Sequence, residues 1–276
     1  QEAVVVGILM TIDKNDSVVT TYRDHGHMIA RGLDPKRIMA ELTGREDGYS
    51  AGKGGSMHMF SKENNFYGGH GIVGAQVPIG TGIAFTHKYN GEKNICRTYI
   101  GDGAMNNGQV FEAFNLAALW KLPVLYIIEN NKYGMGTSVD RAAAGLDLYK
   151  RGEAFGIPGE KVDGMNVFSV IEAADKAGKY VREGNGPYII EVQTYRYRGH
   201  SMSDPAKYRT KEELDNYKQT DPIEIVKAEI LKKKIATNDE IEKINKDTLE
   251  EIKNAAEFAT NSPFPKDSEL YTDVYL

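Results

Sequence analysis

The sequence has few of the features that mark disulfide-bonded, membrane or nucleic-acid-binding proteins. It contains one cysteine, Cys96, so no disulfide can form within the chain, and this suits a reducing compartment. Because no stretch of about 20 uninterrupted apolar residues occurs, no membrane span is predicted. Lys and Arg number 34 against 39 Asp and Glu, and the formal net charge of −5 gives no reason to expect a nucleic acid or an anionic membrane as partner.

The chain has enough apolar residues for a sizeable core. Hydrophobic residues make up 41% of its 276 positions, which indicates one globular domain, or one with a small appendage. Beyond Thr210 the composition shifts to Lys, Glu, Ile and Leu, and Thr237 with Glu240 has the spacing of a helix capping box. We expect a main domain over 1–210 and a helical C-terminal extension over 211–276 packed on it. An apolar stripe for that packing is formed by Ile241, Ile244, Leu249, Ile252 and Ala256.

Two short polar motifs end the strands of one predicted strand-helix-strand unit. Residues 95–100 and 124–128 are apolar runs typical of strands, and residues 108–121 carry apolar side chains at helical spacing. Asp102 follows the first strand in Gly-Asp-Gly, and Asn131 follows the second in Asn-Asn. A right-handed crossover brings the carboxyl ends of both strands to one edge of a parallel sheet, where ligands of open α/β sheets bind. We therefore expect these two side chains to converge.

Asp102 and Asn131 can supply the oxygen ligands that Mg²⁺ shares with phosphate groups. Either motif alone is more often an ordinary turn, because Asp and Asn hydrogen-bond their own backbone and Gly tolerates positive φ. The pair at two strand ends of one crossover is the stronger signal.

Longer motifs connect the chain to a known family. Gly101-Asp102-Gly103-Ala104, followed by Asn130-Asn131, resembles the thiamine-diphosphate motif of thiamine-dependent enzymes. Four more motifs narrow the resemblance to the alpha subunits of pyruvate dehydrogenases, in the thiamine-diphosphate-dependent 2-oxo acid dehydrogenase family. They are Tyr22-Arg23-Asp24-His25-Gly26 and the segments 52–58, 71–76 and 200–205. The resemblance runs from Gln1 to about Phe264 and implies the thiamine-diphosphate-binding α/β fold, a mostly parallel sheet with helices on both faces.

The resemblance also implies a site for thiamine diphosphate and Mg²⁺. The residues expected to bind the cofactor are Tyr22, Arg23, Gly71, Val73, Asp102, Gly103, Ala104, Asn131, Tyr133 and His200. Asp102, Asn131 and the backbone carbonyl of Tyr133 are the expected metal ligands, and two diphosphate oxygens with one water would complete six. An Arg fork such as that of Arg23 can bind diphosphate oxygens in pairs.

His200 is the expected catalytic-site histidine. It lies in a segment of small polar residues typical of a mobile loop, and a histidine titrates near neutral pH. Composition alone would favour an ordinary surface histidine there. Ser201 matches an inhibitory phosphorylation site of mitochondrial relatives, but Lys207 and Arg198 depart from the mitochondrial pattern and favour a bacterial member.

The activity that the resemblance implies is oxidative decarboxylation of pyruvate, with acetyl transfer to a lipoyl-bearing dihydrolipoamide acetyltransferase. It further implies an α2β2 heterotetramer in which a beta subunit completes the active site, so the chain alone should show little turnover. We expect the bacterial cytoplasm, or the mitochondrial matrix for a eukaryotic source. The sequence begins without Met and inside an apparent helix, so we also expect a segment before Gln1.

Other functions remain open at this point. Gly69 to Gly74 matches the dinucleotide fingerprint of nicotinamide-dependent dehydrogenases, which needs a strand directly before it. We expect residues 61–65 to interrupt any such strand, and Pro78 the following helix, within a glycine-rich stretch from Gly44 to Gly82. Gly52-Lys53-Gly54 lacks the first Gly and the final Ser or Thr of a phosphate-binding P-loop. Acetoin and branched-chain 2-oxo acid dehydrogenases, and a non-catalytic scaffold of the same fold, are further alternatives.

Overall fold

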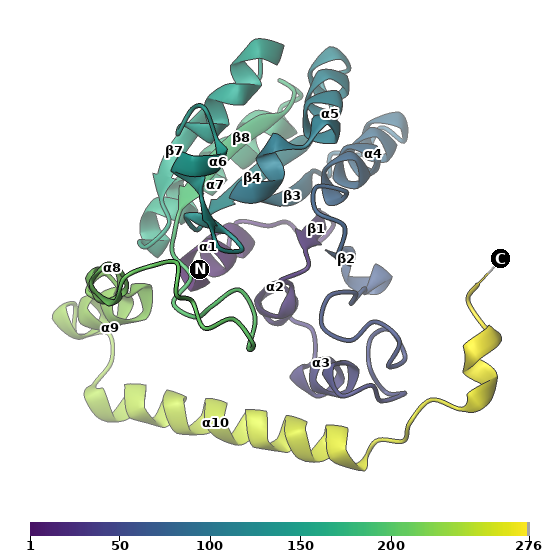
Figure 1. The fold of residues 1–276 in the computed structure, drawn as a ribbon, viewed down its shortest axis with the longest axis vertical. Coiled ribbons are helices and arrows are strands. Elements are labelled where there is room, and N and C mark those ends of the chain that lie inside the picture. Colours follow the sequence, from purple (N-terminus) through teal and green to yellow (C-terminus); the bar gives the residue numbers. More distant parts are fainter. Residues whose placement is uncertain (275–276) are drawn as a thin grey trace.

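A six-stranded parallel sheet forms the centre of the molecule (Figure 1). The computed structural model describes residues 1–274. The strands lie in the order β2-β1-β3-β4-β8-β7, and every neighbouring pair is parallel. They span β1 Ser17–Thr21, β2 Phe66–His70, β3 Cys96–Gly101, β4 Val124–Asn130, β7 Gly159–Asp163 and β8 Tyr188–Gln193. A short antiparallel pair, β5 Tyr133–Gly134 and β6 Thr137–Ser138, lies outside this sheet. The chain is therefore α/β, as predicted.

The helices connect and cover the strands. They span α1 Glu2–Leu9, α2 His25–Ala30, α3 Pro35–Leu42, α4 Gln76–Tyr89, α5 Gly108–Leu119, α6 Val139–Ala142, α7 Val167–Arg182, α8 Lys211–Lys218, α9 Pro222–Lys232 and α10 Asn238–Asn261. Short 3₁₀ segments are η1 Lys62–Asn64, η2 Asp102–Asn106, η3 Leu148–Phe155 and η4 Asp267–Tyr271. None of the helices in residues 1–274 is both long and apolar enough to cross a membrane.

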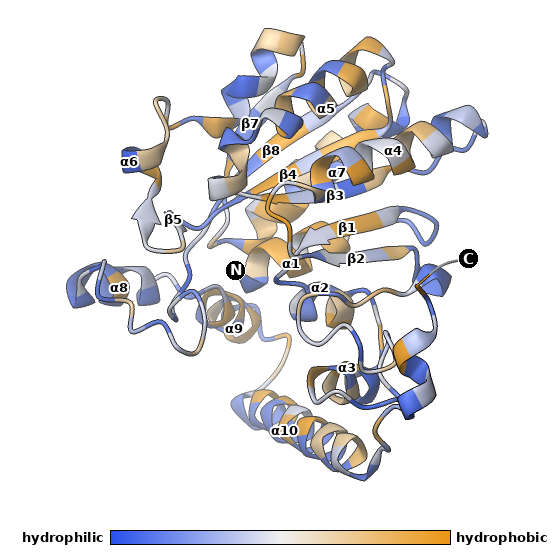
Figure 2. Cartoon of the chain, turned by 45° about the vertical axis from the view of Figure 1, so that its right-hand side comes forward, coloured by the Kyte–Doolittle hydropathy of each residue, from blue (hydrophilic) through white to orange (hydrophobic). Residues whose placement is uncertain are grey.

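Two hydrophobic cores lie on the two faces of the sheet. α1 and α7 pack on one face against Tyr99 and Ile127, whereas α4 and α5 pack on the other against Ile100 and Ile128. Successive residues of β3 and β4 therefore enter opposite cores, as the two-residue period of a strand requires. Figure 2 shows these central strands as mostly hydrophobic. Burial on both faces explains why they appear in the sequence as continuous apolar runs.

The predicted crossover is β3-α5-β4. Its strands pair in parallel with Gly101 opposite Glu129, so the segments that follow them leave at the same edge of the sheet. α5 ends at Leu119, two residues before the predicted end. Lys121 has already turned to a positive φ of 46°, and Pro123 cannot continue a helix.

The glycine-rich stretch contains β2, which the sequence did not predict, and the start of α4. A Cβ at Gly69 would lie 2.3 Å from a carboxylate oxygen of Asp24, so glycine is needed in β2 for close packing and does not mark a loop. Pro78 lies in the first turn of α4, where a backbone N–H needs no partner within the helix. The expectation that no strand precedes Gly69 and that Pro78 interrupts the helix was therefore wrong.

The C-terminal region folds into α8, α9 and α10, and α10 begins with the predicted capping box. The Glu240 carboxylate accepts the Thr237 N–H at 2.7 Å, and the Thr237 hydroxyl accepts the Glu240 N–H at 3.3 Å. Figure 1 shows α10 running past α3 at the margin of the molecule. The predicted stripe does not pack on the body as expected, since Ile244 is 61% and Leu249 64% exposed. α10 buries Ala255 and Ala259 instead, because small side chains allow the helix to approach α3 closely.

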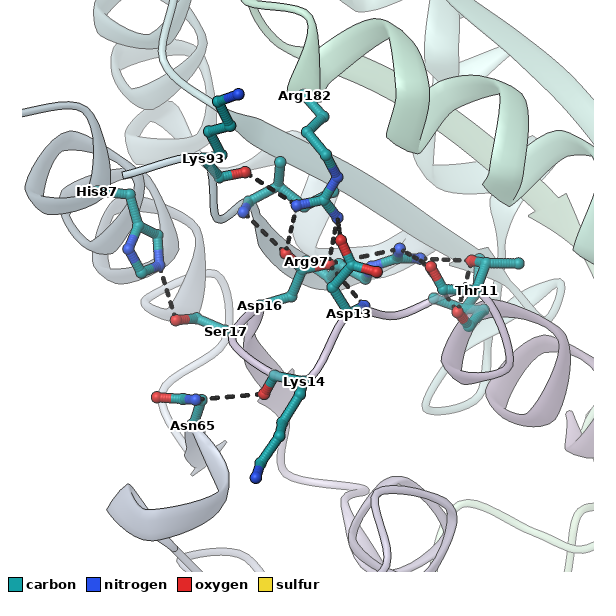
Figure 3. A network of polar contacts seen from close by, with 12 residues as sticks. Thr11, Asp13, Lys14, Asp16, Ser17, Asn65, His87, Lys93, Arg97 and Arg182 are labelled. Carbon is teal, nitrogen blue, oxygen red and sulfur yellow. Dashed lines mark hydrogen bonds and ion pairs between the residues drawn. The ribbon is translucent and has the colours of Figure 1, made fainter. Parts of the chain in front are cut away.

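A buried ion network joins elements at the amino ends of the strands (Figure 3). Asp16, which is fully buried, accepts the Ile95 N–H at 3.0 Å and two hydrogen bonds from Arg182 at 3.0 and 2.8 Å. The Arg97 guanidinium lies 3.7 Å from the same carboxylate and donates to Thr11. One carboxylate therefore links the start of β1 to β3 and α7, and through Arg97 to the end of α1.

Replacing Asp16 with Asn should lower the free energy of unfolding by about 3–5 kcal/mol, because Arg97 would remain buried without its countercharge. Urea unfolding measures this change. Asp13→Asn is the matched control: Asp13 is 67% exposed and pairs with Arg182, a contact of a type that contributes at most about 1 kcal/mol. Equal losses in both variants would contradict the special role of Asp16.

Candidate functional site

A pocket of about 240 Å³ lies at the carboxyl edge of the central strands. Of the ten residues predicted to bind a cofactor, eight line it: Tyr22, Arg23, Val73, Asp102, Gly103, Ala104, Asn131 and Tyr133. Gly71 and His200 are not part of the lining. Gly71 lies against His58, whose ring would be 3.1 Å from a Cβ added at that glycine. The roles of these residues stay predictions, but the structure gathers most of them around one cavity.

Asp102 and Asn131 reach the pocket from the ends of β3 and β4, and each is 6% exposed. The Asn131 side-chain oxygen accepts the Tyr133 N–H at 3.3 Å. Asp102 Oδ2 is buried and has no hydrogen-bond partner within residues 1–274. Since a buried charged oxygen without a partner is costly, this atom suits a cation.

Burial raises the pKa of the Asp102 carboxyl to about 6. Backbone N–H groups of Asp102 and Asn131 offset part of this effect, as do the positive charges of Arg196 and Lys132. At neutral pH the carboxylate is therefore mostly ionised, but burial makes its charged form less stable than that of an exposed carboxylate. A bound cation would relieve that penalty.

The turns after β3 and β4 touch through glycine. A Cβ at Gly103 would lie 3.4 Å from the Cα of Gly134, and a Cβ at Gly134 would lie 3.3 Å from the Cα of Gly103. Side chains at these positions would leave less room between η2 and β5. Glycine at Gly103 and Gly134 therefore lets the two turns approach each other closely.

Arg196 is a pocket residue that the sequence analysis missed. Its guanidinium donates to the carbonyls of Tyr133 at 3.3 Å and Met135 at 3.0 Å, and to the Tyr208 hydroxyl at 2.8 Å. A largely buried guanidinium next to Asp102 suits an anionic ligand that also carries a metal. Its place just after β8, at the same sheet edge, was the available signal.

His200 lies beside the pocket. Its ring centroid is 5.7 Å from that of Tyr22, its carbonyl accepts from Arg23 at 3.3 Å, and its N–H donates to Asp204 at 2.6 Å. The Nδ1 atom is buried and lacks a hydrogen-bond partner in the described chain. Burial, with the positive charges of Arg196 and Arg23, lowers the pKa of His200. The ring is therefore neutral at neutral pH and has a nitrogen available for a ligand.

The glycine-rich loop around Lys53 already holds an anion of its own. Glu41 on α3 is fully buried, and its carboxylate accepts four backbone N–H groups at 2.7–3.0 Å, from Ser50, Gly52, Gly54 and Gly55. Lys53 pairs with Glu269 and Asp273 in the C-terminal segment. Converging N–H groups of this kind bind phosphate in P-loops. Here Glu41 occupies them, so they are not free to bind a phosphate.

Among the described residues, no group of three or more His, Cys, Asp or Glu side chains is arranged to hold a metal. A metal held by protein side chains of these types alone is therefore not indicated there. The predicted Mg²⁺ site is of another kind, because it takes one carboxylate, one amide and one backbone carbonyl and shares the ion with a diphosphate.

Comparison with known proteins adds independent evidence. Residues 1–268 match the family described as Dehydrogenase E1 component. The chain belongs to this family. This membership confirms the predicted resemblance and does not favour a nicotinamide-binding fold.

Relatives in the family align along the whole chain. The pyruvate dehydrogenase E1 component subunit alpha of Rickettsia felis is 58% identical over 275 residues, covering 100% of this chain and 84% of the relative. The protein of the same name from Rhizobium meliloti is 58% identical over 277 residues, covering 100% and 80%. The mitochondrial subunit of Dictyostelium discoideum is 55% identical over 278 residues, covering 100% and 73%.

Asp102→Asn should make the metal-free protein more stable at pH 8. Burial raises the pKa of the Asp102 carboxyl to about 6 in the folded protein. The free energy of unfolding therefore falls by about 2–3 kcal/mol as the pH rises from about 4 to above 6 and the buried carboxyl ionises. Asn removes that cost, so its thermal midpoint should exceed wild type at pH 8, and the difference should shrink toward pH 4. Calorimetry at the two pH values checks this. An equal midpoint at pH 8 would show that the buried carboxylate is not strained.

Glu41→Gln should loosen the loop of residues 50–55, because an uncharged amide with one acceptor oxygen cannot replace a carboxylate that accepts four N–H groups. Amide hydrogen exchange at Gly52 and Gly54 should quicken at least about tenfold, since bonds to charged groups contribute about 1.5–3 kcal/mol each. Glu46→Gln, a partly exposed glutamate of the neighbouring turn, is the control. Unchanged exchange in the Glu41 variant would refute the anchoring role.

Proposed function

We propose that the chain is the alpha subunit of a thiamine-diphosphate-dependent pyruvate dehydrogenase. The reaction is the oxidative decarboxylation of pyruvate, with transfer of the acetyl group to a lipoyl-bearing dihydrolipoamide acetyltransferase. The observation that carries this proposal is the pairing of buried Asp102 with Asn131 in one pocket that Arg23 and Arg196 also line. Family membership and relatives named as pyruvate dehydrogenase subunits support it.

The charges of the pocket suit a diphosphate that carries a magnesium ion. Asp102, Asn131 and the carbonyl of Tyr133 would hold the metal, and the buried Asp102 oxygen without a partner is the group that most needs it. Arg23 and Arg196 would face the remaining phosphate charge. Val73 and the backbone near Gly71 would contact the uncharged part of the cofactor, as would Ala104.

Thiamine diphosphate supplies, when bound, the carbanion chemistry that decarboxylates a 2-oxo acid. The residues of this chain bind and orient its charged end. Gly103 and Gly134 keep the two turns close, so that the groups on β3 and β4 act on one ligand. His200 is neutral because burial and two arginines lower its pKa, so it can accept a proton or a hydrogen bond at the edge of the pocket.

A second subunit belongs to this proposal. The polar groups of the pocket are suited to the diphosphate and the metal, and the relatives are named as one subunit, alpha, of an E1 component. We infer that a beta subunit supplies the rest of the active site in an α2β2 heterotetramer. A lipoyl-bearing acetyltransferase then receives the acetyl group.

The deciding experiment combines the chain with its beta partner and measures turnover of pyruvate, branched-chain 2-oxo acids and acetoin. Pyruvate should be preferred, and turnover should require both subunits, thiamine diphosphate and Mg²⁺. Asp102→Ala should abolish Mg²⁺-dependent cofactor binding and activity, because it removes the charged ligand of the metal. Asp13→Asn, far from the pocket, is the control.

The alternatives give different results in the same assay. A preference for acetoin or for branched-chain 2-oxo acids would instead identify the chain as the alpha subunit of the corresponding dehydrogenase. Robust pyruvate turnover by the chain without a beta subunit, or full cofactor affinity in Asp102→Ala, would contradict it.

A further inference from the structure

One carboxylate of the C-terminal extension reaches the wall of the pocket. Glu213 on α8 accepts hydrogen bonds from the Tyr133 hydroxyl at 3.1 and 2.9 Å, and from the Tyr195 hydroxyl at 3.0 Å. Tyr133 lines the pocket, whereas Tyr195 follows β8 and is 1% exposed. Glu213 therefore joins the loop after β4 to the loop after β8.

The local structure holds Glu213 in this place. Its own N–H donates to the Thr210 hydroxyl at 3.1 Å, which caps α8 and puts Glu213 in the first turn, where the helix dipole favours negative charge. Tyr217, one turn further along α8, stacks on Tyr195 with ring centroids 3.9 Å apart. The Tyr133 and Tyr195 hydroxyls both donate to the Glu213 carboxylate.

The backbone of Tyr133 connects this contact to the predicted metal ligands. The Tyr133 N–H donates to the Asn131 side-chain oxygen at 3.3 Å, and the Tyr133 carbonyl accepts from Arg196 at 3.3 Å. The ring packs on Tyr208, with centroids 5.3 Å apart. A shift of Tyr133 would therefore displace both the Asn131 oxygen and the Tyr133 carbonyl.

We propose that Glu213 is a positioning residue for the metal site: by fixing the Tyr133 hydroxyl, it sets the places of the Asn131 oxygen and the Tyr133 carbonyl. The C-terminal extension is then a working part of the cofactor site. This inference rests on the proposed function for the identity of the ligand, thiamine diphosphate with Mg²⁺.

Four variants of the alpha subunit, each assembled with the beta subunit, test the inference. Tyr133→Phe removes the hydroxyl and keeps the carbonyl, and Glu213→Gln removes the charge at constant shape. Tyr195→Phe removes the other donor and leaves the bond to Tyr133. Glu212→Gln, an exposed neighbour on α8, is the matched control.

Isothermal calorimetry measures Mg²⁺ binding in saturating thiamine diphosphate, and steady-state assays measure the Mg²⁺ dependence of turnover. Tyr133→Phe and Glu213→Gln should each weaken Mg²⁺ binding by about tenfold, the effect of one lost hydrogen bond to a charged group. In Glu213→Gln, kcat at saturating Mg²⁺ should remain close to wild type, because Glu213 is not itself a ligand and the three ligands are intact. Tyr195→Phe should have a smaller effect, and Glu212→Gln none.

These measurements distinguish failure of the positioning role from failure of the proposed function. If wild type binds thiamine diphosphate and Mg²⁺ while Tyr133→Phe and Glu213→Gln bind them equally well, the positioning role is overturned and the proposed function stands. A lower thermal midpoint with unchanged Mg²⁺ affinity would likewise show a merely structural contact. If wild type binds no thiamine diphosphate, the proposed function itself fails.

Discussion

The parallel pairing of β3 with β4 determines where the groups of the pocket lie. Six residue pairs run in register from Cys96 with Val124 to Gly101 with Glu129, so Asp102 and Asn131 follow neighbouring strands within one residue of the same height. A slip by one residue would move one group about 3.3 Å past the other and would also turn the apolar side chains of the strand to the wrong core. The hydrophobic cores on both faces therefore hold the spacing of the polar groups at the edge.

Two buried carboxylates show how environment gives one chemical group two different uses. Glu41 is surrounded by four backbone N–H donors and organises a loop. Asp102 has an oxygen with no partner in the described residues, and burial raises its pKa. The first is a satisfied structural anion. The second has an unfavourable ionised form that a bound cation would stabilise, as is common at binding sites.

The sequence predicts features that depend on local pattern or on a topological rule. The start of α10 follows from the capping box of Thr237 and Glu240, and the meeting of Asp102 with Asn131 in one pocket follows from the crossover rule. β2 escaped prediction because glycines such as Gly69 stand where neighbouring groups leave no room for a side chain, and this looks like a loop in the sequence. The contact of Glu213 with Tyr133 forms because the segment after β8 folds back toward the pocket. No local sequence pattern predicts this long-range contact.

The contact between Tyr133 and Glu213 can form only late in the synthesis of the chain. Tyr133 and Glu213 are 80 positions apart, and β8, which pairs with β4, is also made after Tyr133. At about 5–20 residues per second, the ribosome needs about 4–16 s to reach Glu213 after it has placed Tyr133. During that interval the growing chain has β3 and β4 but lacks the partner that holds the Tyr133 loop. On the proposed role of Glu213, the metal site is complete only after α8 has emerged from the ribosome.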